Sequence, residues 1–139
     1  MNKPALKRLS DSLSKYPVIV AYLFGSEAKG ERGPLSDIDI AVFIDRGIDR
    51  SGRFDLRLRL SSELSGIMNR MVDLVILNDA PVQLAFEIIK YGELIFCGDK
   101  SARVDVETGI ISRYLDRRYY DKRHAELALE KIASRGLSA

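Results

Sequence analysis

Three aspartates in this sequence stand where they could act together. Asp37 and Asp39 are two residues apart at the start of one apolar run, and Asp73 opens another. Side chains two apart in a strand project from the same face, so Asp37 and Asp39 would lie side by side with Cα atoms about 7 Å apart. If the two strands are neighbours, Asp73 joins the pair. The pattern therefore predicts three carboxylates gathered at one edge of a sheet.

Carboxylates held this close repel one another. At ~7 Å and an effective dielectric near 20, each pair costs roughly 2–3 kcal/mol. A divalent cation offsets this repulsion, and all-oxygen ligands suit Mg²⁺ or Mn²⁺ rather than zinc. An Asp-x-Asp pair in a strand is more often a solvated face, but here both aspartates run straight into apolar residues. We therefore expect charges at the mouth of a buried sheet.

The apolar run before these aspartates ends at Gly25 and Ser26. Gly25 permits a tight turn and a close approach of backbone to a ligand. Backbone N–H groups in a turn that enters a helix, together with the Ser26 hydroxyl, suit phosphate oxygens. Alone, such a pair is usually a plain turn. Beside a metal site, it completes the arrangement that phosphoryl or nucleotidyl transfer requires.

The elements that would position these residues follow from the apolar periodicity and from the Gly, Pro, Asn and Asp residues between the runs. Strands are expected at 18–24, 37–44, 71–77 and 93–97. Helices are expected from about 4 to before 17, over 50–68, from about 81 to 90 or 91, and over about 101–135, with Gly109 a weak point. The segment 29–36 is expected to be a loop. This order predicts an α/β (α+β) domain with a mixed sheet of about four strands flanked by helices, the last of them long.

Bulk composition indicates an ordinary globular protein. The chain has 139 residues, 46% hydrophobic and 30% charged, which fits one domain. The formal net charge of +2 does not predict a nucleic-acid partner. Cys97 is the one cysteine and lies in an apolar run, so we expect a buried thiol and a reducing, cytoplasmic compartment. We expect neither a signal peptide nor a membrane span.

Two motifs resemble a known family. The run 24–30 (Phe-Gly-Ser-Glu-Ala-Lys-Gly) and the run 36–40 (Ser-Asp-Ile-Asp-Ile) together resemble the signature of the nucleotidyltransferase superfamily. That superfamily includes DNA polymerase beta and the aminoglycoside nucleotidyltransferases, and the runs are most similar to its minimal nucleotidyltransferase (MNT) branch. The run 72–75 (Val-Asp-Leu-Val) resembles the strand of the third carboxylate. The resemblance covers about residues 18–97.

The resemblance implies a nucleotidyltransferase fold in a single domain over 1–139. Its catalytic core would span about 18–97 and its C-terminal helical segment about 101–135. It assigns catalysis and the binding of two Mg²⁺ ions, or of Mn²⁺, to the three aspartates, and ATP contacts to four residues of the motifs: Gly25, Ser26, Lys29 and Ser36. The family often has Arg where this chain has Lys29, and Lys keeps the charge but lacks the bidentate fork.

The resemblance also suggests an acceptor. Single-domain chains of this size are similar to the antitoxins of HEPN–MNT toxin–antitoxin pairs, which transfer AMP from ATP to a tyrosine of the HEPN toxin and silence it. This implies a HEPN-domain toxin and ATP as partners. Two alternatives stay open: a small-molecule acceptor such as an aminoglycoside, and an antitoxin that acts by binding alone.

Basic residues elsewhere carry less information. Arg50, Arg53 and Arg57 fall along one helical stripe, which we interpret as a solvated face, with a docking surface as the alternative. The basic and aromatic run 117–124 is interpreted as the exposed side of the last helix, with a partner interface as the alternative. His124, the one histidine, is expected at the surface.

Overall fold

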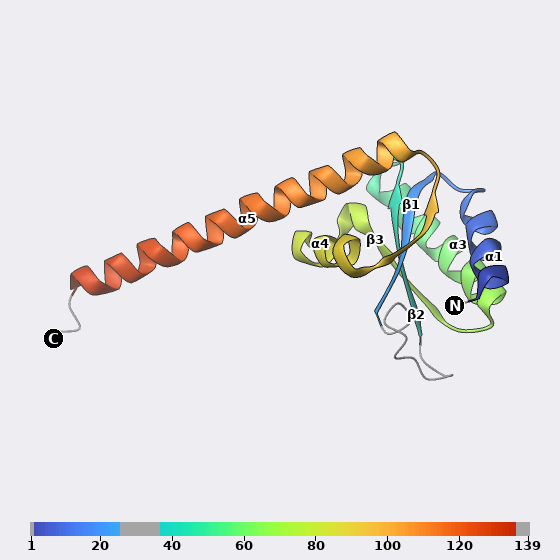
Figure 1. The fold of residues 1–139 in the computed structure, drawn as a ribbon, viewed down its shortest axis with the longest axis horizontal. Helices are drawn as coiled ribbons and strands as arrows, with labels where there is room; N and C mark the ends of the chain where they lie inside the picture. The colour runs from blue at the N-terminus through green and yellow to red at the C-terminus, as the bar shows by residue number, and fades with distance from the viewer. Residues whose placement is uncertain (1, 26–36, 136–139) are drawn as a thin grey trace.

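The computed structural model describes residues 2–25 and 37–135 and contains one four-stranded sheet (Figure 1). The strands are β1 (Val18–Phe24), β2 (Ile38–Ile44), β3 (Val72–Ile76) and β4 (Glu93–Cys97). The described helices are α1 (Lys3–Leu13), α3 (Arg50–Met68), α4 (Val82–Tyr91) and α5 (Lys100–Arg135), with a short 3₁₀ helix, η1 (Leu77–Asp79), after β3.

The sheet is mixed, and its order is β3-β2-β1-β4. β1 runs antiparallel to both β2 and β4, whereas β2 and β3 are parallel. The long α3 supplies the crossover between the parallel strands, as such a connection requires. This architecture confirms the predicted α/β class with a mixed sheet and a long C-terminal helix.

Helices cover both faces of the sheet (Figure 1). On one face, leucines of α1 and α3 pack on alternate residues of the strands, such as Ile40 and Leu74. On the other face, α4 and the start of α5 cover the residues between them, such as Ala41 and Phe43. Because β2 is covered on both sides, its residues from Ile40 onward are almost wholly buried.

Local hydrogen bonds set the helix starts that the sequence indicated. The Asn2 side chain accepts from the Ala5 N–H at 2.9 Å, and the Asp49 side chain accepts from the Gly52 N–H at 2.7 Å. Such N-caps satisfy backbone donors that would otherwise lack a partner. At the other end of α3, Asn69 adopts a left-handed conformation with φ of 55° and ends the helix.

The predicted boundaries hold closely. The strands at 18–24 and 93–97 and the helix at 50–68 have the predicted bounds. The strand predicted at 71–77 is shorter by one residue at each end, because Leu77 already turns into η1. α5 continues unbroken through Gly109, and the predicted loop 29–36 lies outside the described residues.

The prediction of a buried Cys97 is wrong. The residue ends β4 and is exposed. β4 is the outermost strand beside β1, so an apolar run at this position has neighbours on one side only. His124 is exposed, as predicted. None of the helices formed by residues 2–25 and 37–135 has the length and apolarity needed to cross a membrane.

Core packing by α3 gives a stability prediction. Leu64 is fully buried against the sheet, whereas Leu58 of the same helix is 57% exposed. Leu64→Ala should lower the free energy of unfolding by about 2–5 kcal/mol, because it removes buried methyl groups and leaves a cavity. Urea denaturation measures the change, with Leu58→Ala as the matched control. Equal losses in the two variants would contradict the packing described for α3.

Candidate active site

The parallel pairing of β2 with β3 brings the carboxylates together. Asp39 and Asp73 are Cα partners in the ladder, and the Ile38 N–H donates to the Met71 carbonyl at 2.9 Å at its start. Asp37 directly precedes β2. By alternation, Asp37 and Asp39 share a face with Ala41 and Phe43, which pack under α4 and α5. The three side chains therefore lie on the α4 side of the sheet, at the end where β2 and β3 begin.

These carboxylates act on one another through their charges. Partial burial raises the pKa of the Asp39 carboxyl above its ordinary value, and the negative charges of Asp73 and Asp37 raise it further. Asp39 is half-buried, whereas Asp37 and Asp73 are exposed. The ionised form of Asp39 is therefore the one that the fold penalises, and a nearby cation would relieve that penalty.

Gly25 lies directly against Asp39. β1 ends at Phe24, whose Cα partner in β2 is Asp39, and Gly25 follows with φ of 71°. A Cβ placed on Gly25 would overlap the Oδ2 atom of Asp39. Both the left-handed backbone and this close approach require glycine here. Gly25 is thus held against the carboxylate of Asp39.

The other predicted nucleotide-binding residues, Ser26, Lys29 and Ser36, lie outside the described residues. Within the described ranges 2–25 and 37–135, no three Asp, Glu, His or Cys side chains form a group that could hold a metal ion as they stand. The donor chemistry nevertheless fits a hard divalent cation. Asp39 is an oxygen donor that experiences the negative charges of Asp73 and Asp37, and Gly25 leaves its Oδ2 atom free of a neighbouring side chain.

A pocket of about 350 Å³ adjoins Gly25 on the β1 side of the carboxylates. It lies between the end of β1 and α4, and apolar and aromatic side chains line most of it, with Glu87 as its charged residue: Phe24, Gly25, Leu84, Glu87, Ile88, Tyr91 and Gly92. An apolar cleft with a single carboxylate suits a planar base that stacks and donates a hydrogen bond. Sequence reasoning missed this pocket, because α4 approaches β1 only in the folded chain.

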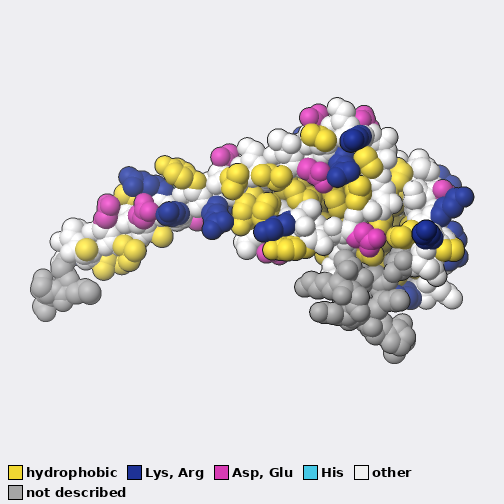
Figure 2. Space-filling view, in the orientation of Figure 1, with side chains coloured by type: hydrophobic (Ala, Val, Ile, Leu, Met, Phe, Trp, Pro, Cys, Tyr) yellow, Lys and Arg dark blue, Asp and Glu magenta, His cyan; other side chains and the backbone are white. Residues whose placement is uncertain are grey.

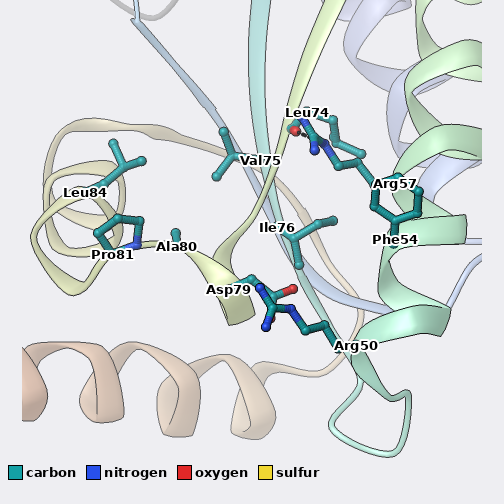
Figure 3. Close-up of a pocket in the computed structure, with 10 residues that line it drawn as sticks. All are labelled: Arg50, Phe54, Arg57, Leu74, Val75, Ile76, Asp79, Ala80, Pro81 and Leu84. Carbon is teal, nitrogen blue, oxygen red and sulfur yellow. Dashed lines mark hydrogen bonds between the residues drawn. The ribbon is translucent and has the colours of Figure 1, made fainter.

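A second pocket, of about 320 Å³, lies along β3 between α3 and α4 (Figure 3). Arg50, Phe54 and Arg57 point toward it from α3, and Leu84 points toward it from α4. β3 is the outermost strand of the sheet on this side, so the pocket borders the strand that carries Asp73.

The arginine stripe of α3 only partly fits the predicted solvated face. Arg53 donates two hydrogen bonds to the Asp79 carboxylate, at 2.9 and 2.7 Å, and the Arg57 Nε donates to the Leu74 carbonyl at 3.1 Å. The stripe thus ties α3 to β3 and η1. The spacing of the arginines was visible in the sequence, but their partners on β3 were not.

Comparison with known proteins identifies the family. The model of the polymerase beta nucleotidyltransferase family matches residues 7–101, which include β1, β2, β3 and the carboxylates. The chain belongs to this nucleotidyltransferase family. The match confirms the family assignment made from the two sequence motifs.

Relatives of this chain include the protein adenylyltransferase MntA of Shewanella oneidensis, which is 35% identical over 91 residues. The alignment covers 66% of this chain and 61% of MntA, so the chain spans less than two thirds of that relative's length. Similar solved structures are a toxin–antitoxin with AMP-PNP, at a TM-score of 0.69 and 23% identity, and a tri-AMPylated Shewanella oneidensis HEPN toxin in complex with MNT antitoxin, at 0.68 and 21%. Each alignment covers 93% of this chain and 99% of the chain in the solved structure, which supports the nucleotidyltransferase fold.

The raised pKa of Asp39 gives a stability prediction. The pKa of Asp39 is higher in the folded state than in the unfolded state, so folding costs free energy when this carboxyl is ionised. This cost is absent below the unfolded pKa, where both states are protonated, and fully present above the folded pKa. Asp39→Asn should therefore unfold at a higher temperature than wild type at pH 7 without added metal, and this advantage should vanish in acid. Thermal unfolding against pH measures it, with exposed Asp55→Asn as the control. A wild-type protein that is more stable than Asp39→Asn at pH 7 would refute the repulsion.

The contact of Gly25 with Asp39 predicts coupled substitutions. Gly25→Ala should destabilise the fold by about 1–3 kcal/mol, because alanine is strained in the left-handed conformation of this residue. The collision of the new Cβ with the Asp39 carboxylate should add to this loss. In an Asp39→Ala background the collision is gone, so the same substitution should cost less. A double-mutant cycle by urea denaturation measures the difference. Additive losses would show that the two residues do not touch.

Proposed function

We propose that this chain is a Mg²⁺-dependent protein adenylyltransferase that moves AMP from ATP onto a tyrosine hydroxyl of a HEPN-domain toxin and thereby neutralises it as an antitoxin. One observation carries the proposal: Asp39 stands between Asp73 on one side and the Gly25 turn on the other, in a chain 35% identical to a protein adenylyltransferase. The cytoplasm, where ATP is at hand, is the compartment that the proposal assigns.

In this proposal the three carboxylates bind the metal ions, and one of them also accepts the proton of the acceptor. Asp37 and Asp39 would hold two Mg²⁺ ions, with Asp73 completing one ligand set, and the ions supply positive charge at the reacting phosphate. Asp73 lies on the β3 side, where it would orient the tyrosine hydroxyl and accept its proton. Gly25, Ser26, Lys29 and Ser36 would hold the triphosphate by backbone N–H groups, hydroxyls and charge.

The reaction that follows from this arrangement is an in-line displacement. The tyrosine oxygen forms a bond to the α-phosphorus while the bond from the α-phosphorus to the oxygen bridging to the β-phosphate breaks. The tyrosine proton passes to the Asp73 carboxylate, and pyrophosphate leaves on the Gly25 side. The pocket between β1 and α4 adjoins Gly25, which supports placing the adenine there, between Tyr91 and Leu84.

Charge favours a protein acceptor over an aminoglycoside. The pocket along β3, the strand that carries Asp73, is lined by Arg50 and Arg57. The one carboxylate among its described lining residues, that of Asp79, is already paired with Arg53. A polycationic small molecule would meet guanidinium groups there rather than acids. A tyrosine on a protein segment has no such conflict.

Loss of one carboxylate should stop the reaction without unfolding the chain. Asp37→Asn should lower AMP transfer by at least roughly 100-fold, because it removes a charged ligand at the reacting phosphate. Labelled ATP, Mg²⁺ and the HEPN toxin form the assay, with Asp55→Asn as the control and circular dichroism to verify folding. Transfer by Asp37→Asn at the wild-type rate would contradict the role of this residue.

The same assay separates the alternatives. Label on a tyrosine of the toxin supports the proposal. A stable complex that neutralises the toxin without label would indicate an antitoxin that acts by binding alone. Label on an added aminoglycoside, and none on the toxin, would indicate a small-molecule nucleotidyltransferase.

A further inference from the structure

The last helix leaves the domain after its first few turns (Figure 1). α5 is 36 residues long, and its fully buried residues are Val106 and Ile110. Tyr114 stacks on Phe86 of α4 with ring centroids 3.8 Å apart, and every residue from Leu115 to Arg135 is exposed. Most helical stability in proteins comes from packing of an apolar face, and the second half of α5 has none within the described chain.

A stripe of mainly apolar positions runs from Ile111 into this unpartnered half. Four of its apolar side chains are between 41% and 66% exposed: Ile111, Leu115, Leu129 and Ile132. Together with Ala125 and with positions 118 and 122, they follow one another at alternating steps of four and three residues. That spacing is the seam of a coiled coil. We define the α5 seam as residues 111, 115, 118, 122, 125, 129 and 132.

The centre of the α5 seam is basic. Arg118 and Lys122 occupy the third and fourth of its seven positions, and neither forms an ion pair within the described part of the chain. Their neighbours off the seam differ: Arg117 pairs with Asp121 at 3.2 Å, and Arg123 pairs with Glu126 at 3.6 Å. Figure 2 shows hydrophobic and basic side chains interspersed along the same projecting helix.

This charge excludes a second copy of the chain as the natural occupant. Parallel pairing of two copies over the full seam sets Arg118 against Arg118 and Lys122 against Lys122. Antiparallel pairing sets Arg118 against Ala125 but still brings the two Lys122 side chains together, and like charges in a seam repel. A helix with apolar residues toward its ends and acidic residues at its centre has no such conflict. Basic side chains also outnumber acidic ones between positions 111 and 135, which attracts an acidic partner at long range.

We propose that the α5 seam docks an amphipathic helix of the HEPN toxin whose facing side carries acidic residues at its centre. This deepens the proposed function, on which the identity of the partner rests. In this arrangement the globular domain carries out the transfer, and the projecting helix holds the acceptor protein beside it. Docking by a separate element raises the local concentration of the acceptor tyrosine.

The test reverses the charge of the seam in the full chain. Arg118→Glu/Lys122→Glu should weaken binding to the toxin by about 100-fold, measured by calorimetry. The matched control, Arg123→Glu/Lys131→Glu, makes the same charge change off the seam and should stay within about 3-fold of wild type. Equal binding by the seam variant and the control overturns the proposal, as does a wild-type chain that does not bind the toxin.

Separate measurements keep this proposal distinct from the proposed function. Binding of AMP-PNP to the seam variant should equal wild type, and Asp37→Asn should still bind the toxin through the seam. If the wild-type chain binds through the seam but transfers no AMP, the docking stands and the adenylyltransferase proposal fails.

Self-association supplies a second test. Arg118→Leu/Lys122→Leu removes the charge from the seam, so the free chain should dimerise at least about 10-fold more tightly than wild type by sedimentation equilibrium. A wild-type chain that dimerises through α5 as tightly as this variant overturns the argument that charge excludes a second copy.

Discussion

The parallel pairing of β2 with β3 is the constraint on which the site depends. It sets Asp39 opposite Asp73 and, through the pleat, turns both toward the α4 side together with Asp37. The fold tolerates this repulsion because the surrounding packing is strong: β2 is buried on both faces, and α3 fixes β3 through side chains bonded to its backbone. Ser61 donates to the Val72 carbonyl and Ser65 accepts from the Val72 N–H, at 3.1 and 2.9 Å. Apolar burial in the middle of the sheet thus offsets the charge repulsion between the carboxylates at its end.

The same strand arrangement places different pockets on the two sides of the carboxylates. β1, on one side of β2, brings Gly25 and the pocket of Tyr91 to Asp39, while β3, on the other side, brings Asp73 and the arginine-lined pocket. A nucleotide approaching from the β1 side and an acceptor from the β3 side would meet over Asp39. The order of the strands therefore gives a direction to the transfer that we propose.

Local patterns in the sequence predicted most of the fold, and contacts between distant segments account for what they missed. The strand 18–24 and the helix 50–68 were predicted with the observed bounds, because apolar runs and the Gly, Pro, Asn and Asp residues between them are local signals. Cys97 was expected to be buried, since a run of apolar residues does not reveal that its strand is outermost. The three aspartates were found from spacing, yet the closeness of Gly25 to Asp39 depends on the register of β1 with β2. Ser26, Lys29 and Ser36 lie outside the described residues, so their roles stay predictions.

The central claim is that Asp37, Asp39 and Asp73 together bind divalent cations. Titration with Mn²⁺ in the presence of AMP-PNP, followed by electron paramagnetic resonance of the free ion, tests it without reference to catalysis. The wild-type chain should bind two ions, and Asp73→Asn should lose at least one of them with its circular dichroism unchanged. Equal Mn²⁺ binding by wild type and by Asp73→Asn, or no binding by wild type, would contradict it.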